Sequence, residues 1–173
     1  MKVYTGAPAV RIAGGVGQGR VRIWEEIKGR WNGKKAADLY TGAVKKALKR
    51  ANPGKKRLRI LEDNDPTGFK SKKAIKAKAS AKIDVFEIPK RSPDLSVMDY
   101  AVWKKINTNM RAQEKRWPSK KRETRAEYIT RLRRTAQNLS RAFVNKAIEN
   151  MKERCQRLYA EKGKHFEEGG KSK

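Results

Sequence analysis

The stretch that decides the fold is RLRILEDNDP, residues 57–66. Its apolar half predicts a short strand over 57–62, and the acidic turn Asp63-Asn64-Asp65-Pro66 follows directly. Carboxylates at the C-terminal end of a strand face the crevice where ligands bind in open α/β sheets. The stretch therefore predicts a binding site at a sheet edge. The alternative for Asp63 is an Asx turn that ends the strand, and Asp65 is expected to be a turn residue rather than a ligand.

Upstream, the sequence predicts two strands and a helix. The strands cover 10–12 and 20–24 around a glycine-rich turn over 14–19, and Val21 and Ile23 alternate with arginines as in a half-buried strand. The glycines do not match G-x-G-x-x-G, and no Gly-Lys-Ser/Thr follows, so we interpret them as a hairpin turn. An apolar face predicts a helix over 34–51, which Asn52-Pro53-Gly54 ends.

Downstream, a lysine-rich helical stretch over 70–81 and a strand over 83–88 precede a second acidic segment. In that segment Asp99 lies in the first turn of a predicted helix. Asp63 and Asp99 are separated by one strand, and two carboxylates that meet across a sheet edge are suitable oxygen ligands for Mg²⁺. The alternative for Asp99 is a capping box, because Ser96-x-x-Asp99 fits that pattern, and the two roles are compatible.

From Asp94 onward the chain is predicted to be helical. A capping box at Thr124-x-x-Glu127 starts one helix, and Asn138-Leu139-Ser140 divides the apolar stripe that follows into two. Cys155 is expected to pack on this stripe, and Trp117 to be the exposed tryptophan. The order of elements predicts an α/β unit over 1–115, a basic helical extension over 116–163 and a disordered tail over 164–173.

The charge of the chain predicts a polyanionic partner. There are 45 Lys and Arg against 18 Asp and Glu, a net charge of +27, and such a field attracts nucleic acid first. A membrane partner is disfavoured, because the chain has no long apolar face free of acids, and neither a span nor a signal peptide is visible. One cysteine and one histidine exclude an intrachain disulfide and a zinc site, and favour a reducing compartment.

Two groups of basic residues are the expected contacts with nucleic-acid phosphates. The first lies in the helical stretch after the acidic turn, and the second follows Trp117. They are Lys70, Lys72, Lys73 and Lys76, and Lys120, Lys121, Arg122 and Arg125. The alternative for each group is a solvated helix surface.

Two motifs together resemble the mariner-type DDE transposases. That family carries D-N-D-P-x-H after a core strand and P-D-L-N-P-I-E-x-x-W at the start of a helix. This chain has Asp63-Asn64-Asp65-Pro66, then Pro93-Asp94-Leu95 followed by Asp99 and Trp103, and the resemblance covers residues 10–115. It implies a ribonuclease H-like mixed sheet with helices, in which three acids hold two Mg²⁺ or Mn²⁺ ions for DNA cleavage and strand transfer. By position, Asp63 would be the second catalytic and metal-binding acid and Asp99 the third.

The chain departs from the family pattern in ways that bear on activity. Gly68 stands where the family often has His, and Ser96-Val97-Met98 replaces Asn-Pro-Ile. No acid lies in residues 1–24, so the first strand with its Asp is expected to be missing, as is the helix-turn-helix region. We therefore predict an N-terminally truncated transposase fragment that does not transfer DNA strands by itself.

The resemblance also implies DNA partners, namely transposon ends and target DNA, and it implies a nuclear location. It leaves homo-oligomerisation open. Two other functions stay open as well. One is a non-catalytic basic nucleic-acid-binding protein of the ribosomal or chromatin kind, which the charge alone would allow. The other is a helical interaction module built on the stripe over 128–158. Divalent-metal binding separates the transposase fragment from both.

Overall fold

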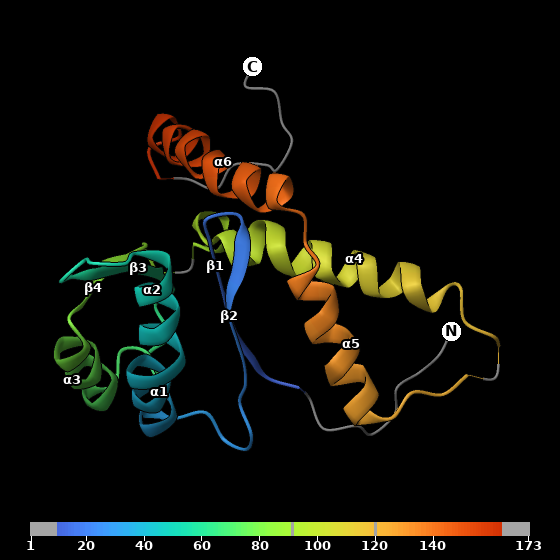
Figure 1. The fold of residues 1–173 in the computed structure, drawn as a ribbon. Coiled ribbons are helices and arrows are strands. Elements are labelled where there is room, and N and C mark those ends of the chain that lie inside the picture. The colour runs from blue at the N-terminus through green and yellow to red at the C-terminus, as the bar shows by residue number, and fades with distance from the viewer. Residues whose placement is uncertain (1–9, 91, 120, 164–173) are drawn as a thin grey trace.

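A computed structural model describes residues 10–90, 92–119 and 121–163 of the chain. A β-hairpin stands between two groups of helices (Figure 1). Ile23 and Trp24 are neighbours on the second strand of this hairpin, and both are buried, but in different hydrophobic cores. Because consecutive strand residues point to opposite faces, the hairpin separates the two cores. The result is a layer of helices on each side of a sheet.

The hairpin consists of β1 (Ile12–Gly17) and β2 (Arg20–Glu26), which pair antiparallel. Its turn is Gln18 and Gly19, which both have positive φ (49° and 73°), as a two-residue type I′ turn requires. The predicted hairpin is confirmed. The turn predicted over 14–19 is wrong in extent, because the first glycines belong to β1.

Gly14 lies in β1 where a helix crosses the hairpin closely. A Cβ atom at this position would lie 2.7 Å from Met98 Cε and 3.0 Å from the Trp103 ring. The glycine is therefore needed for close packing of the segment that carries Asp99, and not for a turn.

A β-bulge changes the predicted alternation in β2. The register shifts between Gly15 and Val16, where β2 has one extra residue, Arg22. Val21 therefore packs against the second core, whereas Ile23 is buried in the first. The prediction that placed Val21 and Ile23 on one face is wrong for this reason.

The helix predicted over 34–51 is a continuous helical rod. It consists of α1 (Gly33–Leu39), the π-helical turn η1 (Tyr40–Val44) and α2 (Lys45–Ala51). Asn32 caps its start by accepting hydrogen bonds from two backbone N–H groups, and Gly54 follows its end with a φ of 78°. Its buried face packs in the first core.

The acidic turn belongs to a strand–helix–strand unit. β3 (Leu58–Glu62) and β4 (Ile83–Glu87) pair in parallel, and α3 (Lys72–Ala81) is the crossover between them. Ser71 caps α3, and Lys82 ends it in the left-handed region with a φ of 56°. The two strands and the helix confirm the elements predicted over 57–88.

The described strands form two separate two-stranded sheets, β1–β2 and β3–β4. A hollow of about 500 Å³ lies between the start of β1 and the end of β3, bordered by Ile12 and Ala13 on one side and by Asp63 and Asp65 on the other. The antiparallel pair and the parallel pair together give the mixed pattern of strands that was predicted.

The rest of the described chain is helical. The elements are η2 (Pro93–Leu95), the π-helical turn η3 (Met98–Val102), α4 (Trp103–Glu114), α5 (Arg125–Gln137) and α6 (Arg141–Ala160). The predicted capping box at Thr124 and Glu127 is present. Residues of α5 and α6 pack with Trp24 and α4 in the second core, so this core crosses the expected boundary at residue 115.

Two predictions for the helical part are wrong. Cys155 is exposed, because the residues that α6 buries among the described part of the chain, Val144 and Ala147, lie in its first half. Trp117 is half-buried, with the Arg131 guanidinium 4.6 Å from its ring centroid. The tail predicted over 164–173 lies outside the described residues. None of the described helices is both long and apolar enough to cross a membrane.

Candidate metal centre

The structure brings the two predicted acids to one hollow. Asp63 follows β3 directly, and Asp99 lies in η3. A hollow of about 290 Å³ lies between them, and both residues line it together with Asn64 and Asp65, with further walls from Ile88, Pro89, Ser92 and Pro93. Residues 36 positions apart in the sequence thus border one space, as the strand-end argument predicted.

The loops that form this hollow are tied to each other. Asn64 donates a hydrogen bond from Nδ2 to the carbonyl oxygen of Ile88, so the ends of β3 and β4 are held side by side. This contact fixes the end of the strand that carries Asp63 next to the segment that leads to Asp99.

The electrostatic environment of Asp63 favours a bound cation. Partial burial of its carboxyl group raises its pKa above the ordinary value, and the negative charges of Asp65, Asp99 and Glu62 act in the same direction. The Asp65 N–H lowers the pKa in part, the contact expected of an Asx turn. A cation in the hollow would relieve the repulsion between these carboxylates.

This pKa shift predicts that the ionised Asp63 carboxylate lowers the stability of the metal-free fold. Because the pKa of Asp63 is higher in the folded than in the unfolded chain, the fold loses stability as the pH rises through this interval and the carboxyl group ionises. We expect Asp63→Asn to raise the melting temperature of the metal-free chain at pH 7. The difference should vanish at a pH below the ordinary pKa of Asp. A metal-free variant that is less stable than the native chain at pH 7 would contradict this.

Asp65 is a turn residue, as predicted. Its Oδ2 accepts hydrogen bonds from Trp31 Nε1 at 2.6 Å and from the N–H groups of Gly68 and Phe69, while Oδ1 accepts from the N–H of Thr67. Burial alone would raise its pKa, but these hydrogen bonds outweigh burial and hold it below the ordinary value. Both of its oxygens thus accept hydrogen bonds from the loop or from Trp31, which leaves Asp63 and Asp99 as the candidate ligands.

Asp99 is exposed at the rim of the hollow. Its backbone N–H donates to the Ser96 carbonyl oxygen at 2.9 Å, and not to the Ser96 hydroxyl as a capping box requires. The capping-box alternative for Asp99 is therefore wrong, and its carboxylate is not used as a cap.

A buried ion pair lies directly behind Asp63. Glu62 accepts hydrogen bonds from the Tyr40 hydroxyl and from Lys78 Nζ, and Lys78 also donates to the Phe69 carbonyl oxygen at 3.0 Å. Glu62 is 8% and Lys78 is 6% exposed. Burial, and then the hydrogen bond with Glu62, raise the pKa of Tyr40 far above its ordinary value, so its hydroxyl stays a donor.

This ion pair was not predicted from the sequence, although a signal was present. Glu62 has the same parity as Leu58 and Ile60 on β3, so it points to the buried face of the strand. Lys78 belongs to the lysine-rich stretch predicted to be helical, and it lies four residues from Ala74 and three from Ala81, which are both buried.

The expected metal ligands do not form a complete site. Within residues 10–90, 92–119 and 121–163, no three His, Cys, Asp or Glu side chains gather closely enough to hold a metal ion. Two carboxylates at one hollow fit part of a divalent-cation site, because oxygen ligands suit Mg²⁺ and Mn²⁺. The larger hollow also borders Asp63 and has space for a further ligand.

The members of the first group of predicted basic residues differ in their surroundings. Lys70 forms an ion pair with Glu87 at 2.5 Å, whereas Lys72, Lys73 and Lys76 are exposed on α3. Ion pairing neutralises Lys70 in part, so the three exposed lysines are the stronger candidates for phosphate contacts.

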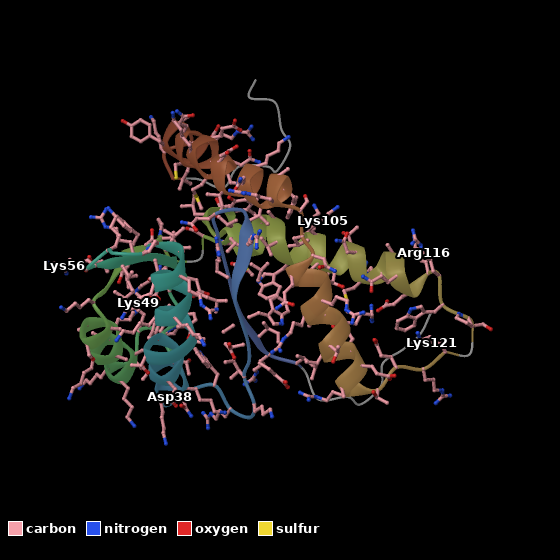
Figure 2. The ribbon with its side chains drawn as sticks, viewed as in Figure 1. Asp38, Lys49, Lys56, Lys105, Arg116 and Lys121 are labelled. Atoms are coloured by element: carbon pink, nitrogen blue, oxygen red, sulfur yellow. The ribbon has the colours of Figure 1, made fainter. Side chains whose placement is uncertain are left out.

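The second group lies on the other side of the hairpin, before and at the start of α5 (Figure 1). Lys121 lies 4.6 Å from the Trp117 ring centroid, Arg122 is exposed, and Arg125 donates to Glu26 at 2.7 Å. Lys120 lies outside the described residues. Figure 2 labels basic side chains on both sides of the hairpin, with Lys49 and Lys56 on one side and Arg116 and Lys121 on the other. The two predicted groups therefore do not form one local patch.

No protein-family model and no curated protein matches the sequence. Solved structures do match. The Mos1 transposase catalytic domain with Raltegravir and Mn has a TM-score of 0.74 at 20% identity, over 91% of this chain and 78% of that one. The Mos1 mariner paired end complex with Mn has a TM-score of 0.79 at 18% identity, over 96% of this chain and 48% of that one. The Mos1 strand transfer complex has a TM-score of 0.71 at 19% identity, over 96% of this chain and 50% of that one.

The chain has a mixed α/β fold of the ribonuclease H-like kind, followed by helices at its C-terminal end. Its fold is that of the Mos1 mariner transposase catalytic domain, so the family resemblance predicted from the two motifs is confirmed at the level of the fold. The chain spans about half the length of the Mos1 chains in the DNA complexes.

Proposed function

We propose that the chain is a fragment of a mariner-type DDE transposase catalytic domain that binds a divalent metal ion between Asp63 and Asp99 and binds DNA. The observation that carries this proposal is the hollow that both acids border, in a fold shared with the Mos1 catalytic domain. The matching Mos1 structures include one with Mn and one with Mg, which supports a divalent ion here as well.

In the proposed site the residues of the chain have distinct roles. Asp63 and Asp99 would hold the ion, while Asp65 stabilises the loop and Glu62, with Lys78, fixes the end of β3. When bound, divalent ions activate water or a 3′-hydroxyl for attack on a DNA phosphodiester. Asp63 and Asp99 would hold the ion at the open rim of the hollow, where DNA can reach it.

Strand transfer needs a more complete site. The larger hollow beside Asp63, between β1 and the end of β3, offers the space for a third acid on a further strand. Without such an acid, the chain by itself is expected to bind metal weakly and to transfer no DNA strands. A nuclear location and the assembly of transposon ends stay predictions.

Titration with Mn²⁺, followed by the electron paramagnetic resonance signal of the free ion, tests the proposed site. The native chain is expected to bind Mn²⁺, and Asp63→Asn and Asp99→Asn should each weaken binding more than about tenfold, because even the outer partners of metal ligands account for about 10–100-fold. The matched control is Asp38→Asn, which removes an exposed carboxylate from α1 (Figure 2) and should change nothing.

Two outcomes of this titration would count against the proposal. If Asp63→Asn and Asp99→Asn bind Mn²⁺ as the native chain does, the hollow is not the metal site. If the native chain binds DNA but no divalent ion, the second candidate function, a non-catalytic nucleic-acid-binding protein, gains support from the net charge of +27.

A further inference from the structure

Asp99 is carried by the π-helical turn that leads directly into α4. η3 is π-helical, and single π-helical turns within α-helices occur frequently at functional sites. No side chain caps the turn at Val97. The elements that pack against η3 therefore contribute to the placement of the Asp99 carboxylate.

Two elements hold η3 from different sides. On the side of the hairpin, the Met98 and Trp103 side chains pack closely over Gly14 of β1. On the side of α6, the hydroxyl of buried Tyr100 donates to the Ala147 carbonyl oxygen at 2.5 Å. Tyr100 is the residue after Asp99, so this bond fixes the backbone next to the acid.

Arg154 of α6 adds two contacts to the same segment. Its guanidinium carbon lies 3.9 Å from the centroid of the Tyr100 ring, and its Nη1 donates to the Asp94 carbonyl oxygen at 3.1 Å. Asp94 precedes the turn and Tyr100 lies within it, so one guanidinium connects both to α6. A planar guanidinium can stack on a ring and donate at its edge at once, which an ammonium group cannot do.

We propose that Arg154, together with Tyr100, is a positioning residue for Asp99. In this way α6 fixes the position of one of the two proposed metal ligands. This inference rests on the proposed metal site. It assigns to α6, whose apolar stripe alone would indicate only packing, a role in the geometry of that site.

Hydrogen exchange of the native chain and of Arg154→Ala tests the proposal without metal. We expect the backbone amides of residues 97–101 to exchange about tenfold faster in Arg154→Ala, while amides around Val144 in the buried part of α6 keep their protection. Arg154→Lys keeps the charge but not the planar group, and should behave like Arg154→Ala. The matched control is Arg157→Ala, which removes an exposed arginine from the same helix and should leave residues 97–101 unchanged.

Mn²⁺ titration of the same variants tests whether Arg154 affects metal binding. Arg154→Ala and Arg154→Lys are expected to bind Mn²⁺ about tenfold more weakly than the native chain, and Arg157→Ala equally well. If Arg154→Ala does not fold, Tyr100→Phe removes only the hydroxyl bonded to Ala147 and should give the same two effects in weaker form.

The outcomes separate this inference from the proposed function. A native chain that binds no Mn²⁺ refutes the metal site, and the inference with it, whatever the exchange of residues 97–101 shows. A native chain that binds Mn²⁺, with Arg154→Ala unchanged in exchange and affinity, overturns the role of Arg154 and leaves the metal site intact. Faster exchange with unchanged Mn²⁺ affinity makes Arg154 a structural residue only, and also overturns the inference.

Discussion

Replacing Lys78 with methionine is expected to lower the free energy of unfolding by about 3–5 kcal/mol, the usual cost of breaking a buried ion pair from one side. Lys78 and Glu62 are both buried, and without Lys78 the Glu62 carboxylate keeps, among the described residues, only the Tyr40 hydroxyl as a side-chain donor. Methionine has a similar length, so the loss would come from the charge and not from a cavity. Urea unfolding monitored by tryptophan fluorescence measures the change.

The double variant Glu62→Gln with Lys78→Met separates this cause from a general packing defect. Removing both charges should regain most of the lost stability, because no uncompensated charge stays buried. Lys76→Met changes an exposed lysine of the same helix and should stay within about 0.5 kcal/mol of the native chain. If Lys78→Met alone is as stable as Lys76→Met, the buried ion pair does not support the end of β3.

The affinity for duplex DNA is expected to fall roughly 10³–10⁵-fold between 50 and 200 mM salt if about 6–10 phosphates are contacted. The cause is counterion release by the basic surface of a chain with a net charge of +27. Replacing Lys72, Lys73 and Lys76 with glutamine should make the log–log slope shallower by about 0.9 for each lysine that contacts a phosphate. Fluorescence anisotropy over a salt series gives the slope.

A second triple variant distinguishes local contacts from total charge. Lys46, Lys49 and Arg50 are exposed on α2, and their replacement by glutamine removes the same charge from another surface. The α3 variant should change the slope more than this control does. Equal changes would refute a specific role for α3, and an affinity independent of salt would favour a protein-interaction module instead.

Much of the fold was predictable because local signals agreed with each other. Period-two alternation and turn residues located the hairpin, and the strand, helix and strand over 57–88 followed from apolar runs and caps. The bulge at Arg22 was not predictable, because it depends on which core each strand residue enters. The exposure of Cys155 was missed for a similar reason: an apolar stripe does not reveal where the opposing layer ends.

The candidate site was predictable in part. Asp63 and Asp99 were identified from their positions at a strand end and a helix start, and the structure places both at one hollow. The buried pair of Glu62 and Lys78 was missed, because Lys78 was considered only as part of a lysine-rich helical stretch. Arg154 had no sequence signal at all, since its contacts to Asp94 and Tyr100 cross more than 50 residues of sequence.

Anomalous diffraction at the manganese edge, from crystals of the native chain soaked in Mn²⁺, tests the central claim most directly. We predict a peak between the carboxylates of Asp63 and Asp99, within the roughly 2.0–2.2 Å range of carboxylate ligands to small divalent ions, and no such peak in Asp99→Asn crystals. A peak at other carboxylates of the chain, or an empty hollow beside fully occupied sites elsewhere, would contradict the assignment of Asp63 and Asp99 as a divalent-metal site.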